Sequence, residues 1–342
     1  MVAFPIATTV RVAQSVVDET YSELAPFQPD RSRRRLEREY ADEHSRFVDV
    51  GGTEIHYRIE GPEGAPTLLL VHGTYSSLHT WDGWVGELSD SYQLVRLDMP
   101  GFGLTGPRVG GPNRLEGLVE MVGTFCDELG LSEVAVAGNS LGGAVAWRLS
   151  VDRPDLVSRL VLLDAGGATL LSILGRKYTP LGSEFIPRYL TPRSALRLIL
   201  KDAYADPSKV TPALVRRYHD LLLRSGNRGA VIEIARNYQR DHDDSYDSRE
   251  RLSVRPPALP SDPDVHPNVQ DDYDIADVSA PTLFQWGAED EWLPMSFGRE
   301  LADQTPDSVF QAYEGVGHIP MEETPTQTAA DAAAFLRATR SA

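Results

Sequence analysis

The sequence predicts an α/β protein, a doubly wound and mostly parallel sheet with an inserted helical cap. Two observations predict this class. Short apolar segments alternate with segments of helical periodicity from about residue 67 to 165, and again from 281 to 337. The alternation stops over residues 166–274, where the pattern is helical. Such an excursion within an alternating chain is typical of an inserted cap.

We therefore expect an N-terminal helical extension over residues 1–45, a core domain formed by residues 46–165 and 275–342, and a helical cap (lid) over residues 166–274. In the extension, residues 8–24 favour an amphipathic helix. It could be a peripheral membrane arm, but its few basic residues favour packing on the core domain or the cap. Within the cap, the pattern predicts helices over residues 194–203, 212–224 and 229–240.

The strands of the core can be assigned in chain order. Residues 46–50 and 53–60 predict a hairpin with Gly51 and Gly52 in its turn. Apolar runs without alternation are typical of strands buried in a parallel sheet. Thr67-Leu-Leu-Leu-Val71 is such a run. Further strands are expected at residues 92–97, 134–138, 159–164, 281–287 and 308–313.

The stretch from residue 134 to 147 carries the main chemical signal. A buried strand leads into Gly138-Asn-Ser140-Leu-Gly142, and a helical pattern follows. This is the G-x-S-x-G nucleophile elbow in its strand–turn–helix context. The glycines let backbones approach closely, and the helix N-terminus offers N–H groups to a developing oxyanion. A glycine-softened turn without chemistry is the alternative, and a base and an acid in the right order would decide between them.

Composition excludes several classes of function. The chain has 342 residues, 41% of them hydrophobic, and a formal charge of −17. Nucleic acid and anionic membranes repel such a surface, so neither is expected as a partner. The single cysteine, Cys126, excludes an internal disulfide and a cysteine-based metal site. It falls in an apolar helical stretch and should be buried.

No segment is long and apolar enough to cross a membrane, and the N-terminus lacks the basic region of a signal peptide. We therefore expect a cytoplasmic protein, and the sequence does not indicate its oligomeric state. The histidines show no ligand spacing, so no metal is expected. Gly101-Phe-Gly103-Leu-Thr-Gly106 matches a dinucleotide-binding loop, but Pro107 follows and no helix can begin there. No cofactor is expected.

Over roughly residues 46–338 the chain resembles capped, single-chain serine hydrolases of the α/β-hydrolase fold superfamily. In that family the order along the chain is Ser, acid, His. The resemblance implies that Ser140 is the nucleophile, Asp290 the acid and His318 the base. The motifs that carry it are His72-Gly73, Asp98-Met-Pro-Gly-Phe-Gly103, Gly138-Asn-Ser-Leu-Gly-Gly143, Gly287-Ala-Glu-Asp290-Glu-Trp-Leu-Pro294 and Gly315-Val-Gly-His318.

The positions of these residues agree with the roles. Asp290 and His318 both follow predicted strands, in loops at the carboxyl edge of the sheet where open α/β proteins gather their sites. The backbone N–H groups of Leu141 and Thr74 would form the oxyanion hole. Asp164, after the strand that follows the elbow helix, is the alternative acid. Asp290 is favoured because it alone stands within a G-x-x-D-x-x-x-P pattern.

A serine at the elbow is typical of carboxylesterases and lipases, and also of C–C bond hydrolases of meta-cleavage products. Gly-Asn-Ser-x-Gly-Gly is common among the latter. In those enzymes the segment after the third strand resembles H-G-S-G-P-G, and an asparagine stands shortly after a tryptophan. Here the segment is His72-Gly-Thr-Tyr-Ser-Ser77, and Gly83 stands at the asparagine position. Ester hydrolysis through an acyl-enzyme is therefore favoured. A small-ligand receptor without turnover is a third hypothesis.

The substrate is expected to be an apolar ester of small to medium size, because the cap over a serine nucleophile forms the roof of the pocket. Interspersed arginines should point to solvent, so no clamp for an anionic substrate is expected. The apolar side chains of the cap are Leu170, Leu171, Ile173, Leu174, Phe185, Ile186, Tyr189, Leu196, Leu198 and Ile199.

Overall fold

The computed structural model describes residues 28–166, 191–243 and 273–338. The amphipathic helix expected over residues 8–24 lies outside these residues. Residues 167–190 also lie outside the described part, and they include the first seven apolar residues named for the cap. Residues 244–272, the last part of the expected cap, lie outside it as well.

Eight strands form one sheet in the order β1-β2-β4-β3-β5-β6-β7-β8. Strand β2 pairs antiparallel with both β1 and β4, and every other pairing is parallel. This confirms the predicted fold class. The strands are β1 (Ser45–Val50), β2 (Thr53–Glu60), β3 (Thr67–Val71), β4 (Gln93–Leu97), β5 (Val134–Asn139), β6 (Val157–Leu163), β7 (Thr282–Gly287) and β8 (Ser308–Tyr313).

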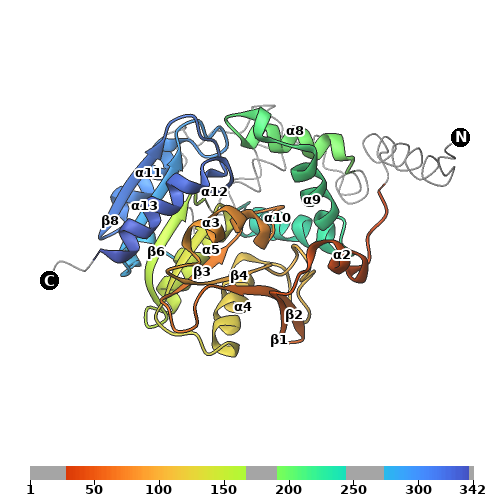
Figure 1. The fold of residues 1–342 in the computed structure, drawn as a ribbon, viewed down its shortest axis with the longest axis horizontal. Helices are drawn as coiled ribbons and strands as arrows, with labels where there is room; N and C mark the ends of the chain where they lie inside the picture. The colour runs from red at the N-terminus through yellow and green to blue at the C-terminus, as the bar shows by residue number, and fades with distance from the viewer. Residues whose placement is uncertain (1–27, 167–190, 244–272, 339–342) are drawn as a thin grey trace, which may run out of the picture.

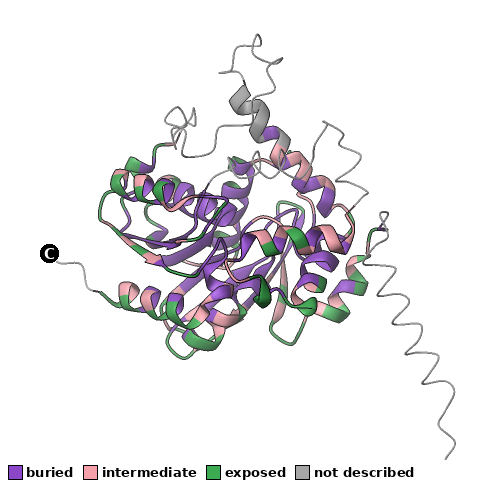
Figure 2. Ribbon diagram, turned by 90° about the horizontal axis from the view of Figure 1, so that it is seen from above, coloured by how far each residue is buried: buried purple, intermediate pink, exposed green. Residues whose placement is uncertain are grey.

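Burial follows the place of each strand in the sheet. Every residue of β5 and β7 is buried, whereas the edge strand β8 alternates between partly buried and exposed positions. The inner strands are covered on both faces, which explains their continuous apolar runs. Figure 2 shows these buried strands in the middle of the molecule, with partly exposed helices around them.

The helices of the core pack in pairs. Helix α3 (Asp82–Leu88) packs against α13 (Pro325–Arg337), and α4 (Leu115–Glu128) packs against α5 (Leu141–Asp152). Helix α11 (Met295–Gln304) packs on β7 and β8. The short elements are η1 (Leu78–Trp81), η2 (Pro207–Lys209), η3 (Ile275–Asp277) and α12 (Pro320–Glu323).

Within residues 191–243, the described part of the chain between β6 and β7, three helices are present, so the predicted helical insertion is confirmed. They are α8 (Arg193–Ala203), α9 (Pro212–Leu222) and α10 (Asn227–Asp243). The start of α9 has a clear local cause. The Thr211 side chain accepts a hydrogen bond from the Leu214 N–H, and Pro212 occupies the first helical position.

The segment before β1 packs against the cap. In helix α2 (Arg33–Tyr40), Leu36 is fully buried between Leu104 of the core and Leu221 of α9. Just before α2, Arg31 forms an ion pair of 2.6 Å with the buried Asp220 of α9. Figure 1 shows α2 beside α9 on one side of the molecule. The described part of the N-terminal region therefore joins the cap to the core.

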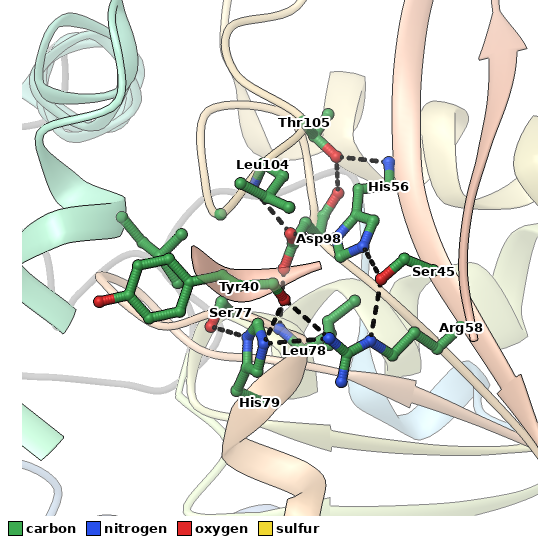
Figure 3. A network of polar contacts seen from close by, with 12 residues as sticks. Tyr40, Ser45, His56, Arg58, Ser77, Leu78, His79, Asp98, Leu104 and Thr105 are labelled. Atoms are coloured by element: carbon green, nitrogen blue, oxygen red, sulfur yellow. Dashed lines mark hydrogen bonds and ion pairs between the residues drawn. The ribbon is translucent and has the colours of Figure 1, made fainter. Parts of the chain in front are cut away.

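A buried carboxylate organises the loops beside β4. Asp98, directly after β4, accepts hydrogen bonds of 2.8 Å each from the Leu78 N–H, the Leu104 N–H and His56 Nδ1 (Figure 3). Burial alone would raise the pKa of Asp98, but His56, first of all through its hydrogen bond, holds that pKa well below its usual range. The carboxylate therefore fixes the loop after β4 and the start of η1 together.

The same network contains a second Ser–His–Asp arrangement. His56 donates from Nδ1 to Asp98, so its Nε2 accepts from the Ser45 hydroxyl at 3.0 Å. Ser45 Oγ also accepts from Arg58 Nε at 3.2 Å (Figure 3). It accepts a further bond from the Asp42 N–H at 3.1 Å. Because every hydrogen-bonding position of the Ser45 hydroxyl has a partner, this arrangement is a structural brace. His56 therefore has a structural role.

The first prediction concerns this brace. We expect Asp98→Ala to lower the free energy of unfolding by about 3 kcal/mol or more, because three buried donors lose their acceptor. Urea unfolding at pH 7 measures this, and Asp90→Ala at an exposed position is the control. Asp98 has a lower pKa folded than unfolded, so its contribution is present above about pH 3.9 and shrinks as the pH falls below that. A difference that grows towards acid would contradict the assignment.

Candidate active site

Ser140 stands between β5 and α5 in a backbone conformation that most residues avoid, with φ 53° and ψ −118°. Steric crowding explains the glycines around it. A Cβ on Gly138 would lie 2.3 Å from the Gly142 carbonyl oxygen, and one on Gly142 would lie 2.2 Å from that of Val71. Only glycine fits at either position. The predicted elbow therefore has the sharp, strained turn that is typical of this motif.

His318 and Asp290 come together, although 28 residues separate them in the chain. His318 Nδ1 and Asp290 Oδ2 are 2.7 Å apart, and both side chains are buried. Asp290 Oδ1 accepts from the N–H groups of Trp292 at 2.8 Å and Leu293 at 3.0 Å. These bonds fix the carboxylate, which in turn places the imidazole proton on Nδ1. The lone pair of His318 is then on Nε2, as a general base requires.

Ser140 and His318 line one small cavity, together with Thr74, Leu196 and Tyr218. Its volume is about 20 Å³, which is room for about one water molecule. Three polar atoms at its walls, Ser140 Oγ, His318 Nε2 and Thr74 Oγ1, are buried and have no hydrogen-bond partner in the described part of the chain. Buried polar atoms normally have partners, so these atoms are suited to receiving them from a substrate.

The loop after β3 is held in place by His72. The Met99 N–H donates to His72 Nε2 at 3.0 Å, so the proton is on Nδ1, which donates to the Gly73 carbonyl at 2.7 Å. Burial lowers the pKa of His72 and keeps it neutral. The ring thus fixes the turn that presents Thr74. Leu141 is the first residue of α5, where a helix leaves its N–H groups free. Both expected oxyanion donors therefore lie beside Ser140.

Asn139 links the elbow to the loop that carries the base. Its Nδ2 donates to the Leu163 carbonyl and to the His318 carbonyl, each at 3.1 Å. An amide nitrogen has two hydrogens, and both are used here. The sequence indicated Asn139 only as part of a motif, and its positioning role was missed.

The cap also holds His318. The His318 N–H donates to the Ala203 carbonyl, the last residue of α8, at 2.7 Å. The buried Glu323 accepts from the Gly317 N–H at 2.7 Å and from the Ala205 N–H at 3.0 Å. Burial raises the pKa of Glu323. The sequence gave no signal for Glu323, because its partners are distant in the chain or belong to the backbone.

Trp292 covers the base from the side of the acid loop. Its ring lies 4.9 Å from the His318 ring, centroid to centroid, and its Nε1 donates to Asp202 of α8 at 2.6 Å. The loop of Asp290, the base and α8 therefore form one connected unit.

Asp164, the alternative acid, lies beside Asp290. It is fully buried after β6, and its Oδ1 accepts from the Gly287 N–H at 3.0 Å. The pKa of Asp164 is raised well above its usual range, mainly by burial and then by Asp290. Ligand atoms of Asp164, Asp290 and His318 lie within 4.8 Å of one another, a spacing that a metal ion could use. His318 Nδ1, however, holds the proton that it donates to Asp290, and it is not free to coordinate one.

A family model for the alpha/beta hydrolase fold matches residues 66–325. The chain belongs to the α/β-hydrolase fold family. It is accordingly a hydrolase of this fold, as the motifs predicted. In the part of the chain that the structure describes, no helix is long and apolar enough to span a membrane.

Three similar proteins show how widely the fold is used. An uncharacterized hydrolase of Bacillus subtilis, YugF, is 24% identical over 85% of this chain and 97% of its own. A 2-hydroxy-6-oxononadienedioate/2-hydroxy-6-oxononatrienedioate hydrolase of Klebsiella pneumoniae is 27% identical over 80% of this chain and 89% of its own. The crystal structure of a membrane phospholipase A aligns with a TM-score of 0.66, at 24% identity, over 99% of this chain and 100% of that one.

The second prediction concerns the nucleophile. An organophosphonate probe should form a covalent adduct on Ser140, and Ser140→Ala should lose labelling and several orders of magnitude of turnover. Peptide mapping by mass spectrometry locates the adduct. Ser45→Ala is the matched control, because Ser45 also bonds a His–Asp pair, and it should label normally. An adduct on any other residue, or on none in active protein, would remove Ser140 from the site.

The third prediction separates the two acids. Asp290→Asn should lower kcat on an activated ester by about 10⁴, because the amide favours the wrong tautomer of His318. Asp164→Asn should lower it far less, because Asp164 is not bonded to the imidazole. Steady-state kinetics on folded, purified variants measures both, and the reverse ranking would move the acid to Asp164.

Proposed function

We propose that the protein hydrolyses carboxylic esters of small to medium apolar substrates through an acyl-enzyme on Ser140. Ser140 Oγ attacks the ester carbonyl while His318 Nε2 takes its proton, and Asp290 holds the imidazole in the required tautomer. The N–H groups of Leu141 and Thr74 stabilise the oxyanion. His318 then protonates the leaving alcohol. A water molecule, activated by the same nitrogen, releases the acid and restores the serine.

The composition of the cavity wall is the observation that supports an apolar ester. Helix α8 contributes Leu196, Ile199 and Leu200, and other described residues add Trp292 and Ile319. Among the described lining residues none is Arg or Lys. The neighbour of Tyr218 in the chain, Arg217, is paired with Glu322 at 2.9 Å. A neutral acyl group therefore suits this wall better than an anionic one.

Hydrolysis of a C–C bond is the rival activity. The substrate in the name of the Klebsiella relative is a dioate, with two carboxylates, and this wall offers no cation for either in its described part. Both amide hydrogens of Asn139 form hydrogen bonds with backbone carbonyls. Gly83 stands at the asparagine position of those enzymes. A Cβ at Gly83 would lie 2.5 Å from the Pro325 side chain. These contacts favour the ester.

A receptor without turnover is the hypothesis from another class, since an intact set of three residues can persist in such proteins. Because the cavity holds about one water molecule, either a ligand or a substrate would require the roof to move. Rapid multiple turnover of any activated ester would exclude the receptor. Turnover confined to a dienoic keto-acid would favour the C–C hydrolase.

The fourth prediction concerns acyl chain length. Four added methylenes are worth about 3 kcal/mol if fully buried, at about 0.8 kcal/mol each, which corresponds to roughly a hundredfold. Allowing for incomplete burial, kcat/KM should rise at least about tenfold from the acetate to the hexanoate p-nitrophenyl ester. A flat or falling series would contradict an apolar acyl pocket.

Adjacent residues of α8 provide a matched pair of variants for this series. Ile199 lines the cavity, whereas Leu198 is 66% exposed. Ile199→Ala should change the slope of kcat/KM against chain length, and Leu198→Ala should leave it as in the wild type. Equal effects of the two substitutions would place the acyl group elsewhere.

A further inference from the structure

Two buried carboxyl groups stand side by side behind the base, and the mechanism above uses only one of them. Asp164 directly follows β6, and Asp290 follows β7, the neighbouring strand of the sheet. Asp164 is fully buried, and Asp290 is 5% exposed. Asp164 also has a positive φ of 40°, which an aspartate adopts at some cost in energy. The fold therefore tolerates a strained residue to keep this carboxyl in place.

The two carboxyls differ in their hydrogen bonds. Asp290 accepts from the Trp292 N–H, the Leu293 N–H and His318 Nδ1. Asp164 accepts one bond, from the Gly287 N–H to Oδ1, and its Oδ2 has no donor among the described residues. Hydrogen bonds to a carboxylate favour the ionised form. The negative charge is thus much better accommodated on Asp290.

Among the residues that the structure describes, none gives Asp164 a compensating cation. The described titratable groups that face it are Asp290, Glu323, the phenol of Tyr313 and His318. Asp290, Glu323 and Tyr313 are acids, and His318 already shares its proton with Asp290. Two adjacent buried carboxyls do not both ionise, because the second charge is repelled and desolvated. One proton must therefore remain on the pair.

We propose that Asp164 is a positioning residue that stays protonated at neutral pH and donates a hydrogen bond from Oδ2 to Asp290. This inference rests on the proposed role of Asp290. A neutral carboxyl orients the carboxylate of Asp290 without adding charge. An ionised Asp164 would instead stabilise the imidazolium form of His318, so the base would be protonated over more of the pH range. Burial and the charge of Asp290, which together raise the pKa of Asp164, support this assignment.

Infrared spectroscopy tests the protonation without relying on activity. At neutral pH the wild-type protein should show the C=O band of a protonated carboxylic acid, and Asp164→Asn should lack that component. Asparagine preserves both contacts, since its Oδ1 can accept from Gly287 and its Nδ2 can donate to Asp290. Identical carboxylic-acid bands in the two proteins would overturn the proposal. Because no substrate is needed, the result stands even if the ester assignment fails.

The pH profile of kcat/KM tests the consequence for the base. If Asp164 is neutral, Asp164→Asn exchanges one uncharged donor for another. The acidic limb, which reports protonation of His318, should then stay where it is in the wild type, with kcat within about threefold. If Asp164 were ionised, the substitution would remove a negative charge beside the imidazole. The limb would then move to lower pH by about one unit or more, and the proposal would be wrong.

A second variant keeps the test independent of how asparagine folds at this position. Glycine suits the positive φ of residue 164, so Asp164→Gly removes the carboxyl without backbone strain. It should also lack the infrared component. It should lower kcat by about tenfold with little change in KM, because Asp290 loses one donor. An unchanged kcat in Asp164→Gly would show that Asp164 does not position Asp290.

Discussion

The close approach of three backbone segments around Ser140 is the constraint on which the site depends. Helix α5 begins so near β3 that Gly142 cannot carry a Cβ, and the end of β5 is as crowded at Gly138. On the β3 side, a Cβ at Gly73 would lie 2.8 Å from the Asn139 side chain. This crowding forces the positive φ of Ser140 and brings the turn of Thr74 beside the start of α5. The same close packing therefore positions both Ser140 and the expected oxyanion donors.

His318, the proposed base, lies in a loop and is held by contacts with other segments. The loop of His318 follows the edge strand β8, and its fixed points are Asn139 of the elbow, Asp290 of the acid loop, Glu323 of α12 and Ala203 of α8. The contact with Ala203 matters most for function, because α8 also supplies the apolar wall of the cavity. Helix α8 thus contacts both the cavity and the backbone of His318.

The sequence predicts well what local chain chemistry determines. The sheet follows from the spacing of apolar runs, and Ser140, Asp290 and His318 follow from short motifs at the ends of strands. Contacts between distant residues leave no such trace. Nothing near Glu323 or Asp98 in the chain shows that Glu323 will bind the backbone N–H of Ala205 or that Asp98 will bind that of Leu78. The sequence also did not predict which side chains of α8 are exposed. Leu198 and Ile199 are both apolar neighbours in the chain, yet Leu198 faces solvent and Ile199 lines the cavity.

The protein contains the combination of serine, histidine and aspartate twice, and hydrogen-bond accounting separates the two sets. In the brace, Asp98 binds two backbone N–H groups besides His56, and Ser45 Oγ has donors from Arg58 and from the backbone (Figure 3). Every polar atom is satisfied, so the set stabilises the fold and has no capacity left for a substrate. At the elbow, Ser140 Oγ and His318 Nε2 are buried at a cavity without partners in the described chain. Burying these two atoms without partners lowers the stability of the fold, and a substrate that forms hydrogen bonds with them would restore this free energy.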